Sequence, residues 1–352
     1  MMTEKPAWLW QRAKEMKDRF ITLAIESSCD ETAAAVSLNG RTVLSSVISS
    51  QIAIHEAYGG VVPEIASRNH LEKVNAVVDE AMEKAGITWD DVDLIGVTNG
   101  PGLIGALVVG VAAAKGYSLA RNIPLVGVNH MHGHVASNLI TYPDLEPPFV
   151  SLVVSGGHTN IVRMEDYSKF TVLGGTRDDA VGEAYDKVAR VIGLGYPGGP
   201  KIDALAKEGN PNAIHFKRVY LEKDSYDFSF SGIKTAVLNY VNSEKQKGRD
   251  IVSADVAAGF QEAVVEVLVN KAVEAVHNLG EDRLVLSGGV AANSRLREAM
   301  QEACQREGIR LYLPELALCT DNAAMIGCAA YYKYKEFGQD KLTIDAYAGM
   351  KF

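Results

Sequence analysis

Three of the eight histidines of the chain stand within five residues, at His130, His132 and His134. On a helix, His130 and His134 lie one turn apart on the same face, a spacing that can hold one metal ion, whereas His132 points elsewhere. Neutral imidazoles suit iron, zinc or nickel, and a carboxylate usually completes such a ligand set. Spacing does not identify that carboxylate, and Asp321 is one of many acidic candidates. The alternative is a polar helix start with chance histidines.

Two glycine-rich turns share one design that could bind phosphate. Ser155-Gly156-Gly157-His158 and Ser287-Gly288-Gly289-Val290 each follow an apolar strand. Because glycine has no Cβ, backbone N–H groups at such turns can approach a phosphate, and the second turn opens a helix whose N-terminus favours an anion. Neither turn is a Walker A loop or a GxGxxG fingerprint. A turn without a ligand is the alternative for each, but two such turns, one expected in each lobe, favour a nucleotide site.

Carboxylates accompany these turns. Glu183, Asp186 and Lys187 fall on or near one face of a predicted helix, and Asp203 follows a Tyr-Pro-Gly-Gly-Pro turn. Carboxylates beside a nucleotide commonly hold ribose hydroxyls or Mg²⁺, although a solvated helix face is the simpler interpretation of each alone. Residues 226–234 interleave aromatic side chains with a lysine, which could stack on nucleic-acid bases. That pattern favours instead a loop that is anchored in the core and caps the next helix.

These residues stand between elements that repeat in order. Strands are predicted at 21–25, 32–38, 42–48, 93–98 and 125–128, and again at 149–154, 159–164, 171–173, 283–286 and 311–313. Helices are predicted at 65–85, 103–119, 180–192, 253–279, 293–307 and 321–333. Both halves begin with three strands and continue with alternating helices and strands. This order predicts an α/β protein with two similar mixed-sheet lobes, joined by a linker at Pro143 to Pro148, with a ligand cleft between them.

Composition excludes several classes of protein. With 47% apolar and 22% charged residues, the chain has the balance of a globular protein and not of a disordered one. Its net charge, 35 − 44 = −9, argues against a strongly basic nucleic-acid binder, although a local basic patch could still meet RNA. The longest apolar stretch, Leu103 to Ala114, is shorter than the roughly 20 residues of a membrane-spanning helix.

Cellular location is predicted from the N-terminus and the cysteines. Met1 to Phe20 lacks the apolar centre and the cleavage site of a signal peptide. The four cysteines form no CxxC pair and suit reduced thiols: Cys29, Cys304, Cys319 and Cys328. We therefore expect a cytoplasmic protein.

Taken in order, these motifs resemble the bacterial TsaD family, the tRNA N6-adenosine threonylcarbamoyltransferases once called O-sialoglycoprotein endopeptidases. The matching segments are 25–32 (IESSCDET), 59–68 (GGVVPEIASR), 99–102 (NGPG), the histidine cluster, 154–159 (VSGGHT), Asp186-Lys187, 196–200 (YPGGP), 228–232 (FSFSG), 288–293 (GGVAAN) and 319–324 (CTDNAA). Together they span roughly residues 21–335, and a series of this kind is very specific.

The resemblance implies a fold and a reaction. The fold is that of actin, sugar kinases and heat-shock ATPases, with two duplicated RNase H-like lobes. It implies an N-terminal extension (1–20), a first lobe (21–148) that the C-terminal helix 329–345 could complete, and a second lobe (149–328). The reaction moves the threonylcarbamoyl group from threonylcarbamoyl-AMP to N6 of the adenosine 3′ of the anticodon. The tRNAs concerned read codons that start with A, and the product is N6-threonylcarbamoyladenosine.

The resemblance also implies which residues carry the reaction. A divalent metal ion, Fe²⁺ or alternatively Zn²⁺, is held at positions matching His130, His134 and Asp321. Threonylcarbamoyl-AMP or ATP meets a larger set of positions: Val153, Val154, Ser155, Gly156, Gly157, Asp186, Gly199, Asp203 and Asn293. Ser28 and Glu31, in the first polar turn, resemble contributors to turnover.

The sequence also leads to expectations about binding partners and about two alternative functions. The resemblance implies tRNA, a paralogous TsaB-type subunit and a small TsaE-type ATPase as partners, and no membrane. The apolar stripe of the helix 65–82 could contact the paralogous subunit, although such a stripe is more often core. A small-molecule phosphotransferase would use the same glycine turns without the paired histidines. A metalloprotease of the HExxH type is disfavoured, because Met131 stands where its glutamate would be.

Overall fold

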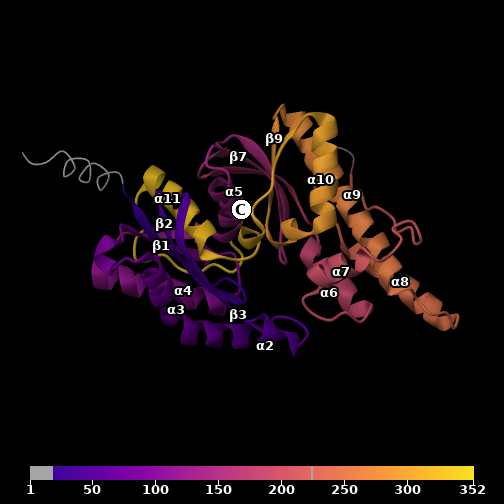
Figure 1. Ribbon diagram of the computed structural model, residues 1–352, viewed down its shortest axis with the longest axis horizontal. Coiled ribbons are helices and arrows are strands. Elements are labelled where there is room, and N and C mark those ends of the chain that lie inside the picture. Colours follow the sequence, from indigo (N-terminus) through magenta and orange to yellow (C-terminus); the bar gives the residue numbers. More distant parts are fainter. Residues whose placement is uncertain (1–18, 223–224) are drawn as a thin grey trace, which may run out of the picture.

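The computed structural model describes residues 19–222 and 225–352, which form two lobes side by side (Figure 1). Only the last two positions of the predicted extension 1–20 fall within the described residues. Each lobe contains a five-stranded sheet, ordered β3-β2-β1-β4-β5 in the first and β10-β9-β6-β7-β8 in the second. In both sheets three antiparallel strands continue into two parallel ones. The prediction of two similar mixed-sheet α/β lobes is confirmed.

The strands form where apolar runs are bounded by turn residues. The first sheet contains β1 (Ile21–Glu26), β2 (Glu31–Leu38), β3 (Thr42–Ser50), β4 (Leu94–Gly100) and β5 (Leu125–Asn129). The second contains β6 (Phe149–Val154), β7 (Thr159–Asp166), β8 (Lys169–Gly175), β9 (Arg283–Ser287) and β10 (Arg310–Tyr312). Residues 39–41 join β2 to β3 as a three-residue hairpin loop, in which Asn39 and Gly40 adopt left-handed φ angles of 53° and 77°. The Asn-Gly hairpin signal is therefore confirmed.

Helices cover both faces of the first sheet. On one face, α3 (Pro63–Ala85) and α4 (Ile104–Arg121) pack against Leu23 and Ile25 of β1. On the other face lie α5 (His130–Thr141) and α11 (Ala323–Phe337), and α11 returns from the far end of the chain. Gly96 of β4 makes this return possible, because a Cβ there would lie 2.6 Å from the Cβ of Ala330. Residues far apart in sequence thus meet at the first sheet.

Among the described helices, α4 is long and apolar enough to cross a membrane by length and composition. The apolar stretch 103–114 is shorter than α4, so the sequence analysis did not predict a helix of membrane-spanning length here. In the structure, α4 packs on the first sheet and against α3, with Leu107 and Val111 buried. Gly110 lies so close to the end of β1 that a Cβ would approach Ser27 Oγ to 2.3 Å. These contacts are those of a helix packed into a protein core.

The second lobe is built around the long helix α9 (Ser253–Leu279), flanked by α10 (Ser294–Glu307), α6 (Val181–Val191), α7 (Gly198–Ala206) and α8 (Ser231–Gln246). Its core contains the fully buried rings of Tyr185 and Phe260, whose centroids lie 5.0 Å apart in an edge-to-face arrangement. Phe228 and Phe230 are also buried, so the segment 226–234 is a core-anchored loop before α8. Phe228 and Phe230 are therefore not available to stack on bases, and Tyr226 is half-buried.

Some elements differ from those predicted. The short helix α2 (Ile52–Glu56) and the helices α7 and α8 had no distinct periodic signal, and α7 begins at glycines and a proline that also mark turns. The predicted C-terminal helix 329–345 is wrong in its bounds: α11 ends at Phe337, because Gly338 takes a φ of 76° that terminates it. Residues 338–352 form neither helix nor strand. The lobe boundaries at 148/149 and 328/329 stay a prediction.

We predict that Phe260→Ala lowers the free energy of unfolding by about 3–5 kcal/mol, because it leaves a cavity in a fully buried, close-packed core. Phe337→Ala is the matched control: its side chain is 64% exposed, so the expected change is within about 0.5 kcal/mol. Urea unfolding followed by circular dichroism measures both. Equal effects of the two substitutions would contradict the assigned core.

Candidate active site

A cavity of about 600 Å³ lies between the two lobes and collects most of the predicted site residues. The turn that joins β1 to β2, residues 28–31, lines it from the first lobe, and the equivalent turn that joins β6 to β7, residues 155–158, lines it from the second. The two turns occupy the same place in the two duplicated sheets. Residues 289–293, after β9, line it as well. The predicted cleft between lobes is therefore present.

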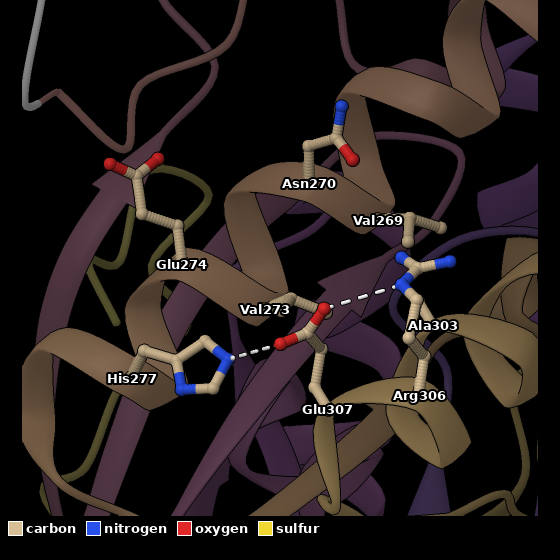
Figure 2. Close-up of a pocket in the computed structure, with 8 residues that line it drawn as sticks. All are labelled: Val269, Asn270, Val273, Glu274, His277, Ala303, Arg306 and Glu307. Carbon is tan, nitrogen blue, oxygen red and sulfur yellow. Dashed lines mark hydrogen bonds and ion pairs between the residues drawn. The ribbon is translucent and has the colours of Figure 1, made fainter.

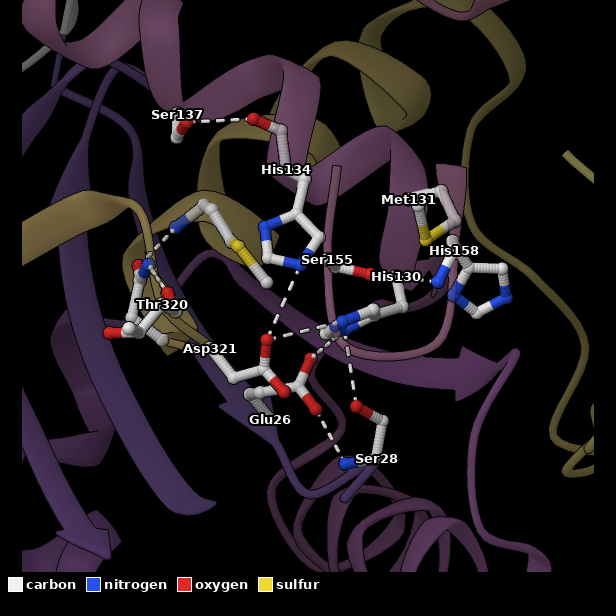
Figure 3. A network of polar contacts seen from close by, with 12 residues as sticks. Glu26, Ser28, His130, Met131, His134, Ser137, Ser155, His158, Thr320 and Asp321 are labelled. Carbon is white, nitrogen blue, oxygen red and sulfur yellow. Dashed lines mark hydrogen bonds and ion pairs between the residues drawn. The ribbon is translucent and has the colours of Figure 1, made fainter. Parts of the chain in front are cut away.

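His130, His134 and Asp321 meet at the edge of this cavity (Figure 3). The parallel strand β5 runs directly into α5, so both histidines lie in the first turns of that helix, one turn apart. Asp321 comes from the turn before α11. The Nε2 atoms of His130 and His134 lie 3.4 Å and 3.3 Å from Asp321 Oδ1, and one ligand atom from each residue lies within 4.8 Å of the others.

The state of His134 tests whether these residues fit a metal ion. Its side chain is fully buried, yet Nδ1 has no hydrogen-bond partner among the described residues, and Nε2 has only the Asp321 carboxylate beside it, at 3.3 Å. A buried polar group without a partner is costly, and a cation bound at Nε2 would remove that cost. The set of two imidazoles and one carboxylate suits iron or zinc. His132 lies on the other side of α5, stacked on Phe170 at 4.1 Å. The residues present fit a divalent metal ion.

Glu26, a residue that the sequence analysis did not single out, contacts the ring nitrogen of His130 that faces away from Asp321. Its Oε2 atom lies 2.9 Å from His130 Nδ1 and accepts a hydrogen bond from Thr98 Oγ1. A carboxylate on the second ring nitrogen fixes the tautomer in which Nε2 is free to bind a metal. One signal could have found it: Glu26 and His130 both follow the carboxyl ends of strands in the parallel half of the sheet, where such ends share one edge.

The buried groups of this cluster shift one another's pKa values, because their opposite charges lie close together. Burial alone would lower the pKa of His130, but the carboxylates of Asp321 and Glu26 raise it well above its ordinary value. Burial would likewise raise the pKa of Asp321, and the charge of His130 lowers it instead. The same opposition lowers the pKa of Glu26. Both carboxylates therefore stay ionised, Asp321 in the wall of the cavity and Glu26 buried behind His130, and their negative charge favours a cation at this place.

The expectation of one glycine turn in each lobe is wrong: the turn after β6 and the turn after β9 both belong to the second lobe, because both strands lie in its sheet. The two turns present backbone to the cavity. A Cβ added at Gly156 or Gly157 would meet no atom within 4 Å, so these glycines face open space. Gly288 has the opposite role: its φ is 91°, and a Cβ would lie 2.3 Å from the carbonyl oxygen of Val154. Any other residue at Gly288 would force the two turns apart. Val153 and Val154 lie in β6 with their side chains in the core, and they do not line the cavity.

The predicted polar residues of the second lobe line the cavity and also hold its walls in place. Asp186 Oδ1 accepts a hydrogen bond from Gly198 N–H at 2.7 Å, and burial raises the pKa of this carboxyl. Asp203 accepts from Ser294 Oγ at 2.9 Å, at the start of α10. Asn293 caps that helix by accepting from Leu296 N–H. Gly199 lines the cavity together with these three residues.

Ser28, Glu31 and His158 complete the lining near the histidines. Ser28 Oγ lies 3.2 Å from His130 Nδ1. Burial, together with the charges of Asp321 and Asp30, raises the pKa of Glu31 to about 9, so this side chain is protonated at neutral pH. Burial and the neighbouring histidines lower the pKa of His158 to about 4, which keeps its ring neutral. The sequence analysis did not assign His158 a separate role.

A second hollow of about 330 Å³ lies between α9 and α10 on the surface of the second lobe (Figure 2). In it, His277 Nε2 approaches Glu307 Oε2 to 3.3 Å, and Arg306 contacts the same carboxylate. These side chains are about one third or more exposed, and none of the predicted site residues lies there. The hollow therefore does not compete with the cleft between the lobes.

The fold and cleft define the class: two duplicated lobes around a ligand cavity, the architecture of actin-like ATPases. Full-length HypF in a phosphate- and nucleotide-bound form is similar with a TM-score of 0.62 at 14% identity, over 91% of this chain and 47% of that one. The chain thus spans about half of HypF. Component A of (R)-2-hydroxyglutaryl-CoA dehydratase from Acidaminococcus fermentans gives a TM-score of 0.53 at 17% identity, over 90% of this chain and 98% of that one. These likenesses establish the fold.

Sequence comparison identifies the family. The profile of the tRNA N6-adenosine threonylcarbamoyltransferases, TsaD, matches residues 42–328. A tRNA N6-adenosine threonylcarbamoyltransferase of Clostridium botulinum is 58% identical over 336 residues, covering 96% of this chain and 99% of that protein. The chain belongs to the tRNA N6-adenosine threonylcarbamoyltransferase family. Its function is the one that the family name states, the transfer of a threonylcarbamoyl group to N6 of adenosine in tRNA.

We predict that Glu26→Gln weakens metal binding by about 10–100-fold. The amide would donate to His130 Nδ1, which forces the ring proton onto Nε2 and blocks the atom that faces Asp321. Isothermal titration with Co²⁺ measures the affinity. Glu165→Gln, an exposed glutamate of β7, is the control and is expected to leave affinity unchanged. Unchanged binding by Glu26→Gln would show that Glu26 does not set the tautomer.

Proposed function

We propose that this chain carries out its transfer as a metal-dependent acyltransferase, with threonylcarbamoyl-AMP as donor and the adenosine 3′ of the anticodon as acceptor. The tRNAs concerned would be those that read codons starting with A, and the protein would act in the cytoplasm. One observation supports this most directly: the His130–His134–Asp321 cluster and the glycine turn 155–158 belong to the same cavity. A metal ligand set and an anion-binding turn can therefore act on one bound molecule.

In this proposal His130, His134 and Asp321 hold the divalent ion, which would be Fe²⁺, with Zn²⁺ as the alternative. Such an ion supplies Lewis acidity that can polarise a carbonyl or orient a carboxylate. Glu26 keeps His130 in the ligating tautomer, and Ser28 lies beside the same ring nitrogen. The residues of the chain around the three ligands exclude water from them and hold their side chains in position.

The second lobe would bind the nucleotide part of the donor. Backbone N–H groups at Ser155, Gly156 and Gly157 can meet the phosphate, and Asp186, Gly199, Asp203 and Asn293 lie along the same wall. The amine nitrogen then attacks the carbamoyl carbon, a C–N bond forms and the bond to the AMP oxygen breaks. AMP leaves with the electron pair, and the amine proton passes to solvent. Alignment of this kind can contribute about 7–11 kcal/mol to the rate.

Glu31 would contribute to turnover as a hydrogen-bond donor. Its carboxyl lines the cavity, and a pKa of about 9 keeps it protonated at neutral pH. A neutral carboxylic acid can donate to a developing negative charge, which an ionised one cannot. ATP could occupy the same cavity, because its phosphates and adenosine offer the same groups as the adenylate.

We predict that Asp321→Ala abolishes product formation, at least a hundredfold below the wild type, because it removes a metal ligand and leaves two buried histidines without their carboxylate. The assay mixes the protein and its partners with threonylcarbamoyl-AMP and unmodified tRNA, and then measures nucleosides by mass spectrometry. The control is Asp144→Ala, an exposed aspartate in the linker between the lobes, which should remain active. Product with Asp321→Ala would exclude the metal role and leave the transferase intact.

We further propose that a paralogous TsaB-type subunit covers an apolar surface on the first lobe, and that this subunit, a small TsaE-type ATPase and tRNA are the partners. The surface carries Ile52 of α2, Tyr58, Leu71 of α3, and Ile104 and Val108 of α4, all exposed. The helix α3 thus keeps Val74, Val77 and Val78 in the core and turns Leu71 outward. With a net charge of −9, the chain also gains from a partner that adds basic surface for tRNA.

We predict that Leu71→Asp weakens association with the paralogous subunit at least tenfold, because it places a charge at the centre of a desolvated contact. Leu316→Asp, at a similarly exposed leucine outside this surface, should leave association unchanged. Sedimentation velocity of the mixed subunits measures the complex. Equal affinity of the two variants would place the interface elsewhere.

A further inference from the structure

We propose that the C-terminal segment, residues 345–352, positions the first turn of α5 and thereby aims His130 and His134 at Asp321. The inference rests on the metal site of the proposed function. The C-terminal end of the described chain lies between the two lobes beside α5 (Figure 1). Although the segment contains neither helix nor strand, three separate contacts join it to the residues around the metal ligands.

The first contact passes through the turn Asn99-Gly100-Pro101-Gly102 at the end of β4. The Tyr347 N–H donates to the carbonyl of Asn99 at 2.8 Å, and the Gly102 N–H donates to the carbonyl of Ala348 at 3.2 Å. Both glycines have close neighbours: a Cβ at Gly100 would lie 2.3 Å from the Tyr347 oxygen, and one at Gly102 would lie 2.5 Å from the Ser28 oxygen. The turn is therefore held between the segment and Ser28.

The second contact is made by Asn129, the residue before His130. Its Oδ1 atom accepts from the Met131 N–H at 2.9 Å and so caps α5. Its Nδ2 atom donates to the carbonyl of Lys351 at 2.7 Å. The side-chain amide of Asn129 thus holds both the start of α5 and the C-terminal segment. A movement of the backbone at Lys351 would pull directly on the cap beside the first metal ligand.

The third contact fixes the rotation of α5 about its axis. His132, between the two ligands in sequence, is stacked on Phe170 of β8, and Phe352 closes on both rings at centroid distances of 5.2 Å and 5.4 Å. The packing of Phe170 and Phe352 against His132 therefore restrains this face of α5. Because His130, His132 and His134 share one helix, a rotation of α5 that displaced His132 would displace both ligands.

The proposed metal site requires that its ligand atoms be placed accurately. Metal–ligand distances are held within about 0.2 Å, whereas an unbraced helix start can fray by more than that. Glu26 and Ser28 restrain only the His130 ring. For His134 the restraint comes through the helix itself, because within the described chain its Nδ1 atom has no hydrogen-bond partner and its Nε2 atom faces only Asp321. Residues of the C-terminal segment are positioning residues, since none of them belongs to the ligand set.

The test uses Co²⁺ as probe, because its visible absorption reports ligand geometry as well as affinity. Phe352→Ala and Asn129→Ser are the variants; serine keeps an oxygen that can cap α5 but does not reach Lys351. We expect both to bind Co²⁺ about tenfold more weakly with an altered spectrum, and Phe352→Tyr to restore both properties. Phe337→Ala, the same change at an exposed phenylalanine, should match the wild type.

Hydrogen–deuterium exchange provides a readout without metal. We expect Phe352→Ala to raise amide exchange at residues 130–135 more than tenfold while the second-lobe helix α9 is unchanged. Affinity within twofold of the wild type, an unaltered spectrum and unchanged exchange would overturn the inference. If the wild type binds no Co²⁺, the proposed metal site fails, and the exchange experiment still decides whether the segment holds α5. If Phe352→Ala does not fold, Asn129→Ser decides both measurements.

Discussion

The rest of the site depends on one interaction, the buried contact between the Glu26 carboxylate and the His130 imidazole. It exists because β1, β4 and β5 are parallel, so their carboxyl ends deliver Glu26, Thr98 and His130 to the same edge of the sheet. Buried charges must be paired, and this pair keeps one ring nitrogen occupied while the other faces Asp321. The candidate metal-binding residues His134 and Asp321, the cap of α5 and the turn at Ser28 are all arranged around it.

Duplication of the sheet explains why two equivalent turns of different chemistry line one cavity. The β1–β2 turn and the β6–β7 turn occupy equivalent places in the two sheets, and the lobes face each other so that both turns line the cleft. The two copies have diverged in chemistry. The first carries Ser28, Asp30 and Glu31, whereas the second carries glycines that leave backbone N–H groups exposed. Opposite walls therefore offer carboxyl groups and anion-binding amides to one substrate.

Sequence periodicity predicted most of the helices and strands because they are long, apolar and bounded by turn residues. It failed where local signals conflict, since α7 begins at glycines and proline that normally mark a turn. The helix 329–345 that accompanied the family resemblance was too long, because the positive φ of Gly338 ends α11 at Phe337. The i, i+4 spacing of His130 and His134 also predicted correctly that their side chains are neighbours. The participation of Asp321 came from a family resemblance, since no spacing rule links residues 191 positions apart.

The sequence by itself determined the duplicated α/β lobes, the glycine turns at strand ends and the pairing of two histidines, because each depends on residues within one turn or one strand. Only the tertiary structure decided what surrounds them. It placed Glu26 behind His130, put Val153 and Val154 in the core beneath the cavity, and brought Phe352 against His132. These contacts join residues whose separation along the chain carries no periodic signal. They form because strand order and the return of α11 bring distant segments together, and that depends on packing over the whole molecule.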